Sequence, residues 1–301
     1  MPSAVRLALL GLPWDRSSSF ARGAAAAPPL IRRALWSPST NSATELGVAV
    51  EPGSLDDRGD LALPNDPAPA RAAMEAGVSA LLEAGLVPLL LGGDHSVTYP
   101  ALRAFRGRSP VTVLHIDAHG DLYDEFPAFA PAFAPDDASA GRRSDDASAE
   151  LRPVPGQVDR YSHACPFARA MEEGLAGRLV QVGVRTQTPH LKAQAVRFGV
   201  EVYGMDRWAA APIEALQGPL YVSLDLDGLD PAFAPGVAHP EPGGLSTRDV
   251  IALLHRIRAP IAGADVVEYN PRHDVRDLTA RVAAKLLKEL VAVAVRNAAT
   301  D

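Results

Sequence analysis

Short runs of Val, Ile, Leu and Ala recur along this 301-residue chain, and they restrict its fold more than any other feature. The runs occupy residues 4–12, 87–91, 111–117, 179–184, 199–203, 219–226 and 261–267. They are continuously apolar, a pattern typical of strands buried on both faces. Helical patterns lie between them, at residues 70–84, at 247–257 with Ser246 as N-cap, and at 278–295. This alternation predicts a doubly wound α/β domain, in which helices flank a central, mostly parallel sheet.

One segment interrupts the alternation. Residues 127–158 are rich in Ala, Pro, Asp and Ser, and they contain two copies each of PAFA and DDASA. Because such a composition buries little apolar surface, we expect a low-complexity insertion that forms a mobile surface loop. A proline-rich tract of this kind could instead bind a partner. We therefore expect residues 1–301 to form one domain, enlarged by this insertion.

Charge and cysteine content restrict the partners and the compartment. Lys and Arg number 29 against 36 Asp and Glu, and the formal net charge of −7 argues against nucleic acid or an anionic membrane as the main partner. No apolar run approaches the ~20 residues that cross a bilayer. The apolar start at residues 4–12 contains Arg6, unlike a signal peptide, and the single cysteine, Cys165, cannot form an intrachain disulfide. We expect a cytoplasmic protein.

Polar clusters follow four of the predicted strands. They are Gly92–Ser96, Asp117–Asp121, Ser223–Asp227 with the nearby Asp230-Pro231, and Asp265–Glu268. The carboxyl ends of parallel strands are where α/β proteins build their sites. The clusters are therefore candidates for one shared site.

The spacing of the acids within two clusters indicates metal binding. Asp117, His119 and Asp121 are two residues apart, so extended backbone would project them to one side, and Asp225 and Asp227 repeat the spacing. Clustered carboxylates repel one another unless they keep protons or bind cations. Carboxylate and imidazole ligands suit Mn²⁺, Zn²⁺, Fe²⁺ or Ni²⁺, and the number of acids favours a binuclear centre.

These motifs resemble those of the ureohydrolases, the family of arginases, agmatinases and their relatives. The matching motifs are GGDHS (92–96), DAHxD (117–121), SxDxDxxDP (223–231), APG…PEPGG (234–244), DVVExNP (265–271), GxPxD (11–15) and RGxxxxPxxIR (22–32). They cover nearly the whole chain in the family's order. The segments DLYD (121–124), YSHA (161–164) and ACPFAR (164–169) are most similar to the agmatinase-like branch that includes plant-type arginases.

The resemblance implies an arginase-like three-layer α/β/α fold and a pair of Mn²⁺ ions. One ion would be bound by His95, Asp117, Asp121 and Asp225, and the other by Asp117, His119, Asp225 and Asp227. A hydroxide between the ions would be the nucleophile. The resemblance also implies that the chain forms a homo-oligomer, a trimer or hexamer.

Three further residues acquire catalytic roles from the resemblance. Asp121 would orient the nucleophile and relay its proton, and Glu268 would pair with the cationic guanidinium group of the substrate. His163 matches a family histidine that acts as a proton shuttle. Tyr123 and His239 would line the substrate pocket. Tyr123 stands where arginases of the animal and bacillus type have Asn, and His239 where much of the family has Thr, although the plant-type branch also has His there.

The implied activity is hydrolysis of a guanidino compound to urea and an amine, with agmatine or L-arginine as substrate. Formimidoylglutamase or guanidinobutyrase activity is an alternative. Two further alternatives are a zinc deacetylase of the same architecture and a non-catalytic metal-binding protein. Both fit less well, because this sequence has a matching residue at all six metal-ligand positions of the family.

Several residues are expected to have no part in the chemistry. We expect His115 to be a hydrogen-bonded core histidine, and His190, His255 and His273 to lie on the surface. Cys165 is not expected to act as a nucleophile. The pair Gly92-Gly93 is better explained by close backbone approach at a turn than by phosphate binding.

Overall fold

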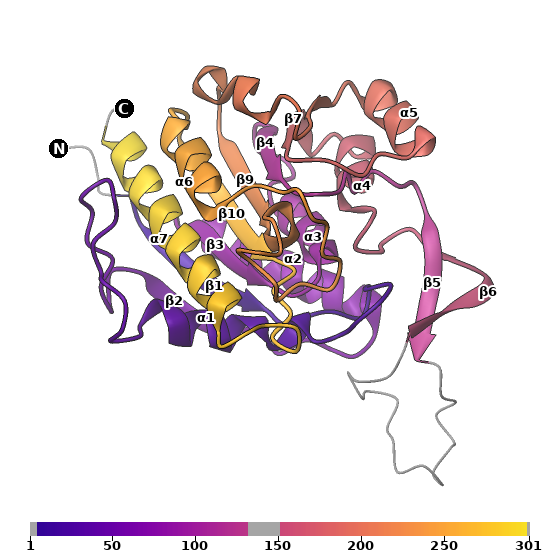
Figure 1. Cartoon of the computed structure of the whole chain (residues 1–301), viewed down its shortest axis with the longest axis horizontal. Coiled ribbons are helices and arrows are strands. Elements are labelled where there is room, and N and C mark those ends of the chain that lie inside the picture. Colours follow the sequence, from indigo (N-terminus) through magenta and orange to yellow (C-terminus); the bar gives the residue numbers. More distant parts are fainter. Residues whose placement is uncertain (1–4, 132–150, 300–301) are drawn as a thin grey trace, which may run out of the picture.

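Eight parallel strands form the centre of the computed structural model, which describes residues 5–131 and 151–299 (Figure 1). In spatial order they are β2 (Asp56–Asp60), β1 (Leu7–Leu12), β3 (Val87–Gly92), β10 (Ile261–Val267), β9 (Leu220–Asp225), β4 (Val111–Ile116), β7 (Ala176–Val182) and β8 (Glu201–Tyr203). All neighbouring strands pair in parallel. The predicted α/β fold is confirmed.

Helices cover both faces of this sheet (Figure 1). One core lies against α1 (Ala27–Leu35), α6 (Thr247–Arg256) and α7 (Leu278–Ala298). The other lies against α2 (Pro67–Glu83), α3 (Thr98–Arg103), α4 (Pro166–Glu172) and α5 (Pro189–Phe198). Successive residues of a strand enter opposite cores: Leu7 and Leu9 join the first, Ala8 and Leu10 the second. This two-sided burial explains why the strands are continuously apolar.

The predicted element boundaries are accurate to a few residues. The first strand begins at Leu7 and the fifth predicted strand at Glu201, while the helix predicted at 70–84 begins at Pro67. Ser246 is the N-cap of α6, in a capping box with Asp249. Strand β2 was not predicted, because its sequence DDRGD carries no apolar pattern. Its charged residues suit a strand at the edge of a sheet.

The insertion differs from its prediction where it is described. Strand β5 (Phe126–Pro131) pairs antiparallel with β6 (Leu151–Asp159), so the expectation of a loop is wrong for these residues. Proline has no backbone N–H to donate, but each strand of a two-stranded pair has one edge that pairs with no other strand, so prolines are tolerated here. Figure 1 shows the pair projecting from the main body. Residues 132–150 lie outside the described residues, and the single-domain organisation stays a prediction.

The strand order brings the four motif-bearing strands together. β3, β10, β9 and β4 are consecutive neighbours at the centre of the sheet, although they come from distant parts of the sequence. The chain leaves β3 toward β4, and the gap between them is filled later by β9 and β10. Their carboxyl ends therefore meet at one edge, the position where open α/β sheets form binding sites. In the two described ranges, no helix is long and apolar enough to cross a membrane.

A buried carboxylate connects helices α6 and α7 with the loop before β2. Glu289 of α7 accepts hydrogen bonds from Lys285 Nζ (2.5 Å), from the backbone N–H of Glu45 (3.0 Å) and from His255 Nε2 of α6 (2.7 Å). His255, predicted to lie on the surface, is only partly exposed, because its ring packs against Glu289. Burial disfavours the ionised carboxylate, but Lys285 and His255 outweigh it and lower the pKa of Glu289.

Replacing Glu289 with Gln is expected to cost about 2–3 kcal/mol and to lower Tm by roughly 5–10 °C at pH 7, because cationic partners lose a buried anion. Because the pKa of Glu289 is lowered in the folded state, its carboxylate stabilises the fold at pH values above the ordinary carboxyl pKa. This stabilisation is lost as the pH falls through the lowered pKa. The difference from wild type should therefore shrink below about pH 4. Thermal melts across pH measure this, with the exposed Glu83→Gln as control. Equal melts of Glu289→Gln and wild type at pH 7 would contradict the role.

Candidate active site

Acidic and histidine side chains follow the four central strands at the carboxyl edge of the sheet. His95 begins a 3-10 turn after β3, Asp117 directly follows β4, Asp225 ends β9, and Glu268 follows β10. All four are at most 3% exposed. The strand order therefore gathers them in one buried site, as the sequence predicted.

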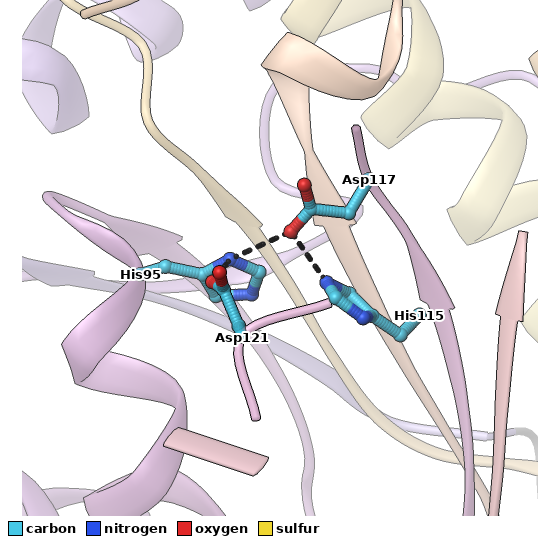
Figure 2. A group of neighbouring side chains, drawn as sticks. All are labelled: His95, His115, Asp117 and Asp121. Atoms are coloured by element: carbon cyan, nitrogen blue, oxygen red, sulfur yellow. Dashed lines mark hydrogen bonds and ion pairs between the residues drawn. The ribbon is translucent and has the colours of Figure 1, made fainter. Parts of the chain in front are cut away.

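Asp117 lies at the centre of this cluster. Figure 2 shows the side chains of His95, His115 and Asp121 gathered around its carboxylate. Asp117 Oδ2 lies 2.6 Å from His115 Nε2 and 3.2 Å from His95 Nδ1. His95 Nδ1 also lies 3.0 Å from Asp121 Oδ2 and 2.9 Å from Asp225 Oδ2. Three carboxylates thus surround one ring nitrogen.

A second group forms on the other side of Asp117. Its Oδ1 accepts a hydrogen bond from the backbone N–H of His119 (2.6 Å), and His119 Nδ1 lies 3.1 Å from Asp227 Oδ2. Asp225 also contacts both groups, because its Oδ1 accepts from the backbone N–H of Asp227 (2.8 Å) while its Oδ2 faces His95. Asp117 and Asp225 therefore each contact both groups.

The ring of His95 provides a test of whether the cluster suits a cation. Its Nε2 lies 2.9 Å from Ser223 Oγ, which itself donates to Asp265 Oδ1 (2.7 Å). Ser223 uses its proton on Asp265, so it accepts from Nε2–H, and Nδ1 is left with a lone pair. Nδ1 is buried and has no hydrogen-bond partner among the described residues. A lone pair facing carboxylate oxygens fits a divalent cation between them.

Electrostatics within the cluster support the same conclusion. Burial raises the pKa of Asp225 well above its ordinary value, and repulsion from Asp227 and Asp117 adds to the effect. Burial also raises the pKa of Asp227 to about 7, although His119 opposes the shift. The pKa of Asp117 is lowered, because contacts with histidines outweigh its burial. So many buried carboxyl groups cannot all be ionised unless cations balance their charge; otherwise some of them keep their protons.

Glu268 and His163 form a pair beside the cluster. Glu268 Oε1 accepts the backbone N–H of His95 (2.8 Å) and lies 3.5 Å from His163 Nδ1. Burial opposes the protonation of His163, but Glu268 outweighs it and raises the pKa of the imidazole. His163 Nε2 lies 2.9 Å from Ser19 Oγ. The imidazole of His163 therefore has one nitrogen near the Glu268 carboxylate and the other near the Ser19 hydroxyl, an arrangement that allows proton exchange between them.

A cavity of about 220 Å³ opens onto these groups. Its lining residues are Ser19, His119, Asp121, Tyr123, Phe126, His163, Ala164, Thr186, Thr188, Leu191, Asp225, Asp227, His239, Glu241 and Glu268. Tyr123 and His239 thus line the cavity, as predicted. The ring of His239 stacks on His163 at 4.9 Å, and burial lowers the pKa of His239 to about 4.

The remaining predicted histidines and the cysteine lie where the sequence suggested, with the exception of His255. His115 is buried and both ring nitrogens have partners, Asp117 at Nε2 and Gln181 at Nδ1 (3.1 Å). The sequence did not reveal that one partner is the central aspartate of the cluster. His190 and His273 are exposed. Burial raises the pKa of the Cys165 thiol, which keeps it protonated and unreactive.

Sequence reasoning missed several residues that line or hold the cavity. Glu241 stands within the PEPGG motif, so the motif could have identified it, whereas nothing in the sequence marks Ser19. Arg185 contributes from outside the cavity. Its guanidinium donates to the backbone carbonyls of Asp227 (2.7 Å), Leu229 (3.2 Å) and Glu241 (2.6 Å). One half-buried cation thereby fixes the two loops that carry Asp227 and Glu241.

Close backbone packing explains the glycine pair after β3. A Cβ at Gly93 would lie 1.7 Å from the carbonyl oxygen of Trp14, a distance that no side chain allows. The approach lets the Asp94 backbone N–H donate to that same oxygen (2.8 Å). Asp94 then accepts from the backbone N–H of Ser17 (2.9 Å) and so holds the loop that carries Ser19. The prediction of a tight turn is confirmed.

Comparisons with known proteins agree with this geometry. The model of the Arginase family matches residues 5–292. "Arginase 1, mitochondrial" of Arabidopsis thaliana is 43% identical over 94% of this chain and 80% of that protein, and the guanidinopropionase of Pseudomonas aeruginosa is 32% identical over 99% and 89%. The solved arginase of Medicago truncatula superposes with a TM-score of 0.82 at 39% identity, covering 97% of this chain and 88% of that one.

Proposed function

Because this chain belongs to the arginase family, we propose that it is a binuclear manganese enzyme that hydrolyses L-arginine or agmatine to urea and an amine. At the level of the family, the chain is a ureohydrolase that acts on C–N bonds of guanidino compounds. The observation that carries the finer proposal is the donor set, in which the bare Nδ1 of His95 faces three carboxylate oxygens in a buried site.

Six side chains would hold the two cations. His95, Asp117, Asp121 and Asp225 would bind one, and Asp117, His119, Asp225 and Asp227 the other. The bridging roles of Asp117 and Asp225 are supported by the contacts that each makes with both groups. Manganese is proposed because the donors are mainly carboxylates with one imidazole for each ion, and no sulfur ligand. When bound, the cations would supply the Lewis acidity that makes water a nucleophile at neutral pH.

Glu268 would bind the substrate guanidinium. Its carboxylate lines the cavity, and it retains its charge because His163 lowers its pKa despite burial. The φ angle of Glu268 is 64°, in the left-handed region of backbone conformation. A residue other than glycine is strained in this region and stays there only if neighbouring groups hold its backbone. The backbone N–H of Glu268 donates to the Gly93 carbonyl (2.8 Å) and provides such a hold.

Asp121 and His163 would move the protons. Hydrolysis adds the oxygen of water to the guanidinium carbon, breaks one C–N bond and transfers a proton to the leaving amine. Asp121 lines the cavity beside His95, so it can accept the proton of the attacking water and pass it to that amine. His163, between Glu268 and the hydroxyl of Ser19, would exchange protons with the outer part of the cavity.

The outer part of the cavity favours substrates that end in an ammonium group. Glu241 lies near the mouth, with Oε1 4.0 Å from His119 Nε2, and no Lys or Arg occurs among the described lining residues. The carboxylate of Glu241 attracts a positively charged tail of a substrate. At the end opposite the guanidinium, agmatine carries an ammonium group alone and L-arginine carries an ammonium group beside a carboxylate, whereas 4-guanidinobutyrate carries a carboxylate and no ammonium group.

Turnover of four substrates tests this assignment. The Mn²⁺-loaded protein is expected to release urea from L-arginine or agmatine with kcat/KM at least about tenfold above that for 4-guanidinobutyrate, because the latter has no ammonium group that could pair with Glu241. Formiminoglutamate completes the panel. Preferred turnover of formiminoglutamate or 4-guanidinobutyrate would replace the proposal with the formimidoylglutamase or guanidinobutyrase alternative. A single metal ion for each chain, with activity only on acetylated amines, would favour the deacetylase.

We also propose a homo-oligomer, a trimer or hexamer, and a cytoplasmic location. The plant relatives have names that assign those proteins to mitochondria or chloroplasts. A cytoplasmic location for this chain is supported by its single, buried cysteine, which fits a reducing compartment. Light scattering of the purified protein and fractionation of the source cells would contradict these proposals if they gave a monomer or an organellar protein.

A further inference from the structure

Aromatic side chains form part of the cavity lining, and one of them comes from the β5–β6 strand pair. Phe126 begins β5 and lines the cavity. Its ring lies 5.0 Å from the ring of Tyr123 and meets the ring of His163 edge-on at 6.4 Å. His163 in turn stacks on His239. Phe126 thus packs against both Tyr123 and His163 within the cavity lining.

The base of the strand pair is fixed to the main body. Arg169 of α4 is 3% exposed. Its Nη1 donates to the backbone carbonyl of Asp124, just before β5, and to that of Arg160, just after β6 (3.1 Å). Asp159 at the end of β6 accepts the backbone N–H of Tyr161 (2.7 Å). One buried guanidinium therefore holds both ends of the pair, and this fixes Phe126 relative to the catalytic groups.

Part of the cavity lining is apolar. Tyr123, Phe126 and Leu191 supply large apolar surfaces, whereas the carboxylates come from the sheet edge and from Glu241. A guanidino substrate that reaches from Glu268 to the mouth has a chain of methylene groups between its two polar ends. These methylene groups gain free energy by contact with an aromatic ring.

We propose that Phe126 determines substrate specificity, by forming the wall against which the methylene chain of the guanidino substrate packs. This inference rests on the proposed function and extends it to a residue of the β5–β6 strand pair. The ring of Phe126 packs on Tyr123 and meets His163 only edge-on, so we expect it to act mainly on binding of the methylene chain.

The test compares Phe126→Ala with wild type on the better of L-arginine and agmatine. Loss of the ring is expected to raise KM about tenfold and to change kcat by less than about twofold. Phe126→Tyr, which keeps the ring, should restore KM. Val158→Ala is the matched control, because Val158 pairs opposite Pro127 on β6, is 55% exposed and does not line the cavity.

The outcomes separate this inference from the proposed function. A wild-type protein that turns over none of the four substrates refutes the proposed function and this inference with it. An active wild type with an unchanged KM in Phe126→Ala refutes the inference alone. A fall in kcat, Tm and metal content together, with no rescue by Phe126→Tyr, would show a structural role and also overturn it.

Discussion

Replacing Asp225 with Asn is expected to lower kcat/KM at least about a thousandfold, or roughly 4 kcal/mol of transition-state stabilisation. Asp225 has one oxygen 2.9 Å from His95 Nδ1 and the other on the backbone N–H of Asp227, so its charge serves both halves of the cluster. Asn preserves the shape and one acceptor oxygen but removes that charge. Metal content after Mn²⁺ loading should fall below two ions for each chain.

Thermal melts provide a second readout for this variant. Addition of Mn²⁺ should raise the Tm of wild type, because binding to the folded state alone stabilises it, and the rise should largely disappear in Asp225→Asn. Without metal the variant should melt no lower than wild type, since it removes one of several mutually repelling buried carboxylates. The exposed Asp66, whose side chain makes no capping hydrogen bond, gives the control Asp66→Asn. Full metal content together with wild-type activity in Asp225→Asn would refute the bridging role.

Glu268→Gln is expected to lower kcat/KM by about two orders of magnitude, mostly through KM, because the guanidinium loses its buried anionic partner. The amide oxygen of Gln can still accept the backbone N–H of His95, which Glu268 Oε1 accepts at 2.8 Å, so the local fold should persist. Steady-state kinetics on the preferred substrate measure the loss.

Metal content distinguishes this effect from that of Asp225→Asn. Glu268 is proposed to bind substrate, so Glu268→Gln should retain the Mn²⁺ content of wild type and its Mn²⁺-dependent rise in Tm. Glu51→Gln, at an exposed position, is the matched control. If Glu268→Gln kept the KM of wild type, the guanidinium would have to bind elsewhere.

The sequence predicted the type of fold and the ends of its main strands, because burial on both faces leaves a continuous apolar pattern. It did not predict β2, whose stability comes from pairing with β1 at the edge and not from its own apolar residues. The insertion was also misread in part. Its composition argues against a packed core, but β5 and β6 need only each other and the anchor at Arg169.

At the site, local spacing was informative and long-range packing was not. The Asp-x-His-x-Asp and Asp-x-Asp spacings predicted which side chains would gather, since they follow strand ends. The order β3, β10, β9, β4, which makes them neighbours, depends on pairings between distant segments that no local pattern encodes. Arg185 and Phe126 were missed for the same reason, because their partners lie far away in the sequence.

The position of β10 has a consequence for how the protein is made. β10 is the last strand of the sequence, yet it lies in the interior of the sheet, between β3 and β9. During synthesis, the earlier strands emerge with an open gap at the centre of the sheet, and Glu268 emerges after all six proposed ligands. The sheet, and with it the proposed metal centre, can close only after β10, which ends at Val267, has left the ribosome. Metal uptake should therefore be a late event in folding, and release of a nascent chain truncated before residue 261 should give a product that retains no tightly bound Mn²⁺.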